Sequence, residues 1–108
     1  MFWGEGGMNM LMLVFRSSLK DRVHVLLEQC DVRAYTEMPE TIGAGQTGPA
    51  EGVSFYPGVN SVIMVAVDDA HAERVEHTVK AWRDEVTQRP GGQKPSIRMF
   101  TWPCRQLT

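Results

Sequence analysis

The stretch that decides the fold runs from Val59 to Gln88 and reads VNSVIMVAVDDAHAERVEHTVKAWRDEVTQ. Its first part, Val59 to Val67, is almost continuously apolar, which indicates a strand buried inside a sheet. Asp69 then predicts a helix N-cap. Beyond it, apolar residues recur at the spacing of one helix face, at Ala72, Val75, Val79, Trp82 and Val86. The stretch therefore predicts a strand that leads directly into an amphipathic helix.

The N-terminal part of the chain has the same order. Met8 to Phe15 reads MNMLMLVF and predicts a second buried strand. Ser18 and Asp21 have the spacing of a capping box and predict a helix start. The apolar stripe of this helix consists of Leu19, Val23, Leu26, Leu27 and Cys30. Cys30 is accordingly expected in the core.

Two further strands complete the chain. Val32 to Met38 alternates with period two, and so does Ser96 to Trp102, where Ile97, Met99 and Thr101 share one face. The resulting order, β-α-β-β-α-β, predicts an α+β fold of the ferredoxin-like type, a four-stranded antiparallel sheet with both helices on one face. We expect residues 8–108 to form this single domain, preceded by a disordered leader, residues 1–7, of sequence MFWGEGG.

The first strand is apolar on both sides. Met8, Met10 and Met12 share one face and Leu11, Leu13 and Phe15 the other. Two helices cover only one face of such a sheet, and the chain offers no further element for the second. A partner subunit is therefore expected on the open face, and we predict a homo-oligomer.

Composition excludes several classes of protein. The chain of 108 residues carries 11 Lys+Arg and 13 Asp+Glu, a net charge of −2, which argues against nucleic-acid binding. No apolar run approaches the length of a membrane span, so no membrane insertion is expected. Two cysteines, Cys30 and Cys104, form no disulfide framework, which favours a cytoplasmic setting. From Arg89 onward the charged residues are all basic (Arg89, Lys94, Arg98 and Arg105), so a bound anion is expected near this end of the chain.

A long segment, Pro39 to Gly58, separates the two middle strands and contains five glycines and three prolines. A loop of this length in a small domain usually has a function. Residues 43–48 read GAGQTG and match G-x-G-x-x-G, but no helical stripe follows, so a Rossmann site is not expected. The glycines can instead offer backbone N–H groups to an anion, or serve only as a flexible loop.

This layout resembles P-II signal-transduction proteins and their P-II-like relatives. There, the second strand leads through a G-x-G segment into a long T-loop, an acidic pair such as Asp68-Asp69 begins the second helix, and a B-loop with glycine and lysine precedes the last strand. The resemblance implies a homotrimer that binds an adenine nucleotide (ATP, ADP or AMP) in clefts between subunits and contacts a target protein, a transporter or an enzyme, through the T-loop. The ligand-binding residues it implies are Gly43, Gly45, Gln46, Arg89, Gly91, Gly92 and Lys94. The partner-binding loop it implies contains Thr47, Gly48, Glu51, Phe55 and Tyr56.

The sequence also departs from the P-II pattern. Gln46 follows Gly45 directly, Tyr56 stands outside the setting of the modified T-loop tyrosine, and the B-loop lacks its Asp and contains Pro90 and Pro95. The sequence therefore resembles a divergent member, and nitrogen sensing and 2-oxoglutarate binding are not carried over.

The alternative is a metal-binding protein of the similarly built CutA-like type, with Cys104 or the histidines as ligands. His71 and His77 are six residues apart and do not share a helix face, and His24 lies off its helix's apolar stripe, so all three are expected at the surface. No nucleophile-and-base signature is present, and a strand end with two acids, Glu37 and Glu40, is common. We therefore predict that the chain is not an enzyme.

Overall fold

The computed structural model describes residues 7–42 and 59–108. The elements follow one another as β1 (Met8–Arg16), a short 3-10 turn η1 (Ser17–Leu19), α1 (Lys20–Gln29), β2 (Thr36–Ile42), β3 (Val59–Asp68), α2 (Asp69–Gln88) and β4 (Ile97–Pro103). The predicted order of strands and helices is confirmed.

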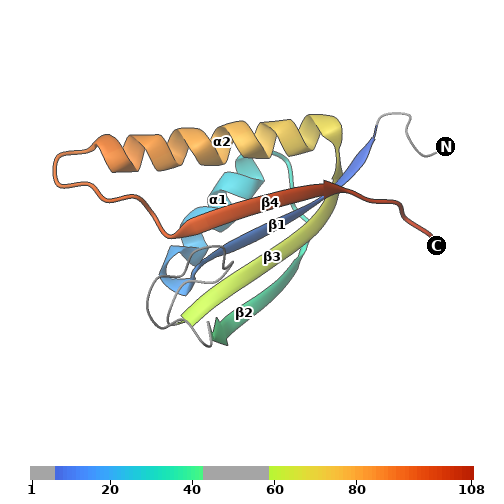
Figure 1. The fold of residues 1–108 in the computed structure, drawn as a ribbon, viewed down its shortest axis with the longest axis horizontal. Helices are drawn as coiled ribbons and strands as arrows, with labels where there is room; N and C mark the ends of the chain where they lie inside the picture. The colour runs from blue at the N-terminus through green and yellow to red at the C-terminus, as the bar shows by residue number, and fades with distance from the viewer. Residues whose placement is uncertain (1–6, 43–58) are drawn as a thin grey trace.

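The four strands form one sheet in the order β2-β3-β1-β4, and every neighbouring pair is antiparallel. Both helices lie against the same face of this sheet (Figure 1). This is the predicted ferredoxin-like α+β fold. β2 and β4 are the two edge strands.

The core lies between the sheet and the helices. Leu11, Leu13 and Phe15 of β1 are buried there against the helix residues Val23, Leu27, Val75 and Val79. Cys30 is 1% exposed and belongs to the same cluster, as its place on the apolar stripe predicted. Because side chains alternate along a strand, Met10 and Met12 lie on the other face, which no described element covers.

The second strand differs from its prediction. β2 begins at Thr36, four residues later than expected, and continues through Pro39 to Ile42, so that the long segment loses its first four residues to the strand. Met38 pairs with Val62 and Thr41 with Asn60, which places one extra residue in β2. Pro39 has no N–H for the ladder, and Glu40 has a positive φ of 58°, as is typical of a β-bulge. The bulge allows β2 to continue beyond Pro39, the residue before which the sequence predicted the end of the strand.

Both predicted helix starts were wrong in detail. Ser18 makes no cap hydrogen bond because the chain first forms the turn η1, and α1 begins at Lys20 after Leu19, which provides no side-chain cap. The N-cap of α2 is Asp68 rather than Asp69. Two adjacent aspartates satisfy the same sequence pattern, and only the backbone conformation decides which one caps.

Within the part of the chain that the structure describes, no helix is long and apolar enough to cross a membrane.

Candidate functional site

Two loops implied by the sequence leave the same end of the sheet. β2 ends and β4 begins there, and the connection between α2 and β4 extends beyond that end (Figure 1). The two strands are nevertheless the opposite edges of the sheet. Three strand spacings separate them, about 14 Å. Within one chain, the base of the long segment and the start of β4 therefore lie at the same end of the sheet but on its opposite edges.

The basic loop, residues 89–96, has a defined turn at its start. The Gly92 N–H donates to the Arg89 carbonyl at 2.7 Å, and Gly91 has a φ of 72°, which favours glycine. A Cβ on Gly92 would overlap the Val86 carbonyl oxygen, so the chain needs glycine there to pass the end of α2. The predicted glycines are thus required by the turn itself.

The basic side chains of this loop lie at the surface. Arg89 Nη2 is 3.7 Å from Glu85 Oε1, and Lys94 is exposed. Arg98 follows in β4 on the face away from the helices. The predicted residues Gly43, Gly45 and Gln46, and the whole predicted partner loop, lie outside the described residues.

The base of the long segment is held by buried polar residues. Asn60 and Ser61 are both 0% exposed at the start of β3, and the hydroxyls of Ser61 and Ser17 are 3.0 Å apart. Together with the bulge at Pro39 and Glu40, they give the strands next to the loop a fixed geometry.

A further polar pair connects α1 to β2. His24 Nε2 lies 2.7 Å from Glu37 Oε1, and the Glu37 side chain is only 18% exposed. Its second oxygen, Oε2, is buried without a hydrogen-bond partner in the described part of the chain. His24 is 35% exposed, so it lies at the surface as expected, but its contact with Glu37 was not predicted, because Glu37 lies thirteen residues away on another element and gives no local signal.

Tyr35 lies beside this pair, with its ring centroid 5.9 Å from that of His24. Burial raises the pKa of the Tyr35 phenol, and the nearby carboxylates Glu37 and then Glu28 raise it further. The carboxylates of Glu37 and Glu28 make this cluster around Tyr35 acidic. Its contacts connect α1 to β2, the strand that leads to the long segment.

The metal candidates are not brought together. The His71 ring contacts Asp68, its Nδ1 lying 2.8 Å from Asp68 Oδ1, and Cys104 is only half-buried. Among the described residues, no group of three His, Cys, Asp or Glu side chains could hold a metal ion. The structure therefore gives the CutA-like alternative no support.

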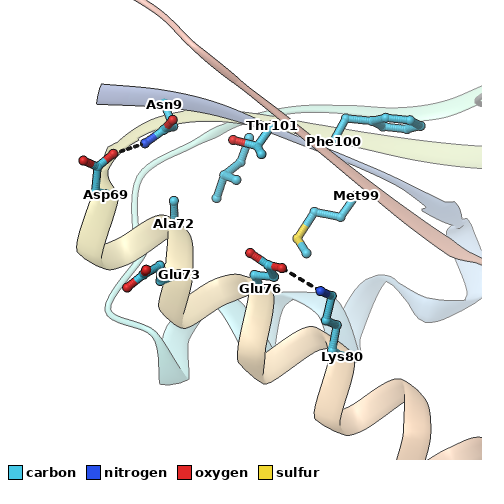
Figure 2. A pocket seen from close by; sticks show the side chains of 10 residues that line it. Asn9, Asp69, Ala72, Glu73, Glu76, Lys80, Met99, Phe100 and Thr101 are labelled. Atoms are coloured by element: carbon cyan, nitrogen blue, oxygen red, sulfur yellow. Dashed lines mark hydrogen bonds and ion pairs between the residues drawn. The ribbon is translucent and has the colours of Figure 1, made fainter. Parts of the chain in front are cut away.

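A groove between α2 and β4 was missed at the sequence level. It encloses about 510 Å³, and its lining includes Asp69, Glu73, Glu76 and Lys80 of α2 and Met99 and Thr101 of β4 (Figure 2). The acids are spaced by four and three residues, which places them on one helix face. That spacing was the available signal, but only the packing shows that this face meets an edge strand.

Solved structures provide the comparison with known proteins. CPII of Thiomonas intermedia K12, bound to ADP and bicarbonate, is 18% identical and superposes with a TM-score of 0.63 over 90% of this chain and 85% of its own. A P-II-like signalling protein of Thermus thermophilus is 15% identical over 90% of this chain and 86% of its own, with a TM-score of 0.57. Arabidopsis thaliana P-II bound to citrate is 14% identical over 95% and 80%, with a TM-score of 0.60. No family model and no curated protein sequence matches.

The fold is thus that of the P-II-like signalling proteins, and the resemblance seen in the sequence is confirmed at the level of the fold. With identities of 14–18%, these neighbours define the architecture of this chain and leave its ligand to be argued from its own residues.

Proposed function

We propose that this protein is a regulatory protein that binds an adenine nucleotide between copies of the chain and signals to a target protein through its long loop. The observation that carries this proposal is that the end of β2 and the start of β4 lie at one end of the sheet but on its opposite edges. A ligand held at the start of β4 in one copy and next to the end of β2 in another would lie between the two copies.

Charge supports an anionic ligand. The loop after α2 supplies Arg89 and Lys94, and no acidic residue follows Glu85 in the sequence. Phosphate oxygens favour such side chains and backbone N–H groups. Gly43 and Gly45 of the other copy would provide the N–H groups. CPII, which shares the fold, has been solved with ADP, AMP and bicarbonate.

The open face of the sheet supports assembly. Cross-strand rows Trp102–Met10–Ala66 and Phe100–Met12–Met64 run across it, and Met38 adds to it from β2. Three of these side chains remain 37–41% exposed: Phe100, Trp102 and Met38. Further copies would bury this apolar surface, and we propose a homotrimer.

Titration calorimetry with ATP, ADP and AMP tests the site. Charge-assisted hydrogen bonds contribute about 1.5–3 kcal/mol, so Lys94→Ala should weaken nucleotide binding by roughly ten- to a hundredfold. Lys20→Ala, an exposed lysine of α1, is the matched control and should bind like the parent protein. The proposal is wrong if no adenine nucleotide gives heat, or if Lys94→Ala binds unchanged.

A further inference from the structure

We propose that the groove between α2 and the outer edge of β4 binds an extended, lysine- or arginine-bearing segment of a partner protein as an added strand. This surface lies outside the proposed nucleotide site, since it uses residues Asp69–Lys80 and Met99–Thr101 rather than the loops. Strand addition to a sheet edge is a common mode of peptide recognition.

The backbone of β4 points hydrogen-bonding groups outward at this groove. In the β1–β4 ladder, the Arg16 N–H donates to the Ser96 carbonyl at 3.0 Å and the Cys104 N–H donates to the Met8 carbonyl at 3.1 Å. Antiparallel pairs alternate, so the even-numbered residues of β4 bond to β1 and the odd-numbered ones face outward. Met99 and Thr101 therefore present two N–H donors and two carbonyl acceptors to an added strand.

The same two residues point their side chains toward α2 and line the groove (Figure 2). Ala72 adds apolar surface, and Leu11, which is only 2% exposed, also lines the groove. An added strand would thus place every second side chain in the groove. Its other side chains would extend the apolar open face beside Phe100 and Trp102.

The wall of the groove, formed by Asp69, Glu73, Glu76 and Lys80 of α2, favours basic side chains. Asp69 accepts a hydrogen bond from the Asn9 side chain, and Glu76 is paired with Lys80 at 2.6 Å. Glu73 has no hydrogen bond or ion pair with any described residue. With three acids and one lysine, the wall carries a net charge of −2, and Glu73 is the group available to an incoming ammonium or guanidinium.

Charge also argues against the other edge strand of a second copy as the occupant. The other edge strand of this chain, β2, reads TEMPETI, and its two charged residues, Glu37 and Glu40, are acidic. The side chains of β4 that face α2 are uncharged, and its charged residue, Arg98, lies on the other face, so Met99 and Thr101 offer an added strand an edge without charged side chains on the groove side. A basic extended segment of another protein matches both the edge and the wall.

A peptide series tests the proposal. The peptide TKVKVKT places three lysines on one face of a strand, TEVEVET reverses their charge, and TKPKPKT cannot complete a strand ladder. Binding followed by amide chemical shifts of the ¹⁵N-labelled full chain should show saturable shifts at Met99 and Thr101 with TKVKVKT. TEVEVET should bind at least about tenfold more weakly, and TKPKPKT should not bind.

Two pairs of variants separate the edge from the wall. Thr101→Pro removes an outward N–H and should weaken TKVKVKT by at least about tenfold, whereas Thr101→Val keeps the N–H and should not. Glu73→Gln should weaken binding about threefold, and Glu85→Gln, the same charge removal about 18 Å along α2, should leave it unchanged. If Thr101→Pro does not fold, TKPKPKT and Glu73→Gln still test the proposal.

The proposal is overturned if TKVKVKT does not bind at millimolar concentration, if its shifts lie elsewhere, or if Glu73→Gln and Thr101→Pro bind as the parent does. It is also overturned if the Met99 and Thr101 amides already resist exchange in the free protein, because another copy would then occupy the edge. ADP titration of the unchanged protein and of the same variants keeps the two proposals apart: if the unchanged protein binds ADP but not TKVKVKT, only this proposal is refuted, and if Thr101→Pro and Glu73→Gln lose peptide binding but keep ADP binding, it is supported.

Discussion

At the scale of single residues, the junction between β3 and α2 depends on one aspartate. The His71 N–H donates to Asp68 Oδ1 at 2.7 Å, and the His71 ring lies 2.8 Å from the same oxygen. The backbone hydrogen bond from His71, and then its side chain, lower the pKa of Asp68. A lowered pKa means that the cap stabilises the ionised form and so favours the fold when Asp68 is charged.

Asp68→Ala should lower the free energy of unfolding by about 1 kcal/mol at pH 7, and Asp68→Asn, which can still cap, by less. The folded-state pKa lies below the unfolded value of 3.8, so this stability is present above pH 3.8 and is lost as pH falls through the folded pKa. Urea unfolding at pH 7 and at about pH 2.5 checks it: the difference between parent and Asp68→Ala should shrink at the lower pH. An equal difference at both values would contradict the assignment of the cap.

Gly92 is the second decisive residue. Gly92→Ala places a Cβ against the Val86 and Arg89 carbonyls and should destabilise the protein by about 1–3 kcal/mol. Because the turn would reorganise, nucleotide affinity should fall with it. Gln93→Ala, one residue further along the same exposed loop, is the control for both measurements. Unchanged urea unfolding of Gly92→Ala would show that the turn is not needed.

At the scale of elements, β2 is the strand whose position the structure explains best. It lies at an edge, contains a bulge, and is tied to α1 through His24 and Glu37. The long segment follows Ile42, the last residue of β2. The contact between α1 and β2 therefore also positions the base of that segment.

A double-mutant cycle on His24→Ala and Glu37→Ala should give a coupling of about 1 kcal/mol in unfolding free energy. The double variant should lose less unfolding free energy than the sum of the two single changes. His24→Ala alone leaves both Glu37 oxygens without a hydrogen-bond partner among the described residues, and this cost disappears when Glu37 is also replaced. His77→Ala, an exposed histidine of α2, is the control. Additive effects of the two changes would show that the contact contributes nothing.

At the scale of the whole molecule, the apolar open face of the sheet favours assembly, because further copies of the chain would bury it. Trp102→Glu places a charge beside Met10 on that face and should shift the assembly to monomers. Val25→Glu on α1 is the control and should leave the protein assembled. Val25 and Trp102 are similarly exposed, at 41% and 40%, but only Trp102 lies on the open face. Sedimentation at micromolar concentration measures both, and a monomeric parent protein would refute the trimer.

Much of the fold could be predicted from the sequence because it depends on local patterns. The stripe Val75–Val79–Trp82 defined α2, and the alternation in Ile97–Met99–Thr101 placed those side chains on one face of β4, which the structure shows to be the face toward the helices. Gly91 and Gly92 in the segment before β4 are also typical of the turn that the structure shows there.

Other features were decided only by the tertiary structure, because they join residues that are distant in the sequence. The pairing of His24 with Glu37, the position of β2 and β4 on opposite edges of the sheet, and the acidic wall beside β4 each depend on which elements pack together. The outward direction of the Met99 and Thr101 backbone depends on register, and a shift of one residue would turn those groups inward. Periodicity therefore determined the elements of this protein and their faces, whereas packing and register decided what those faces meet.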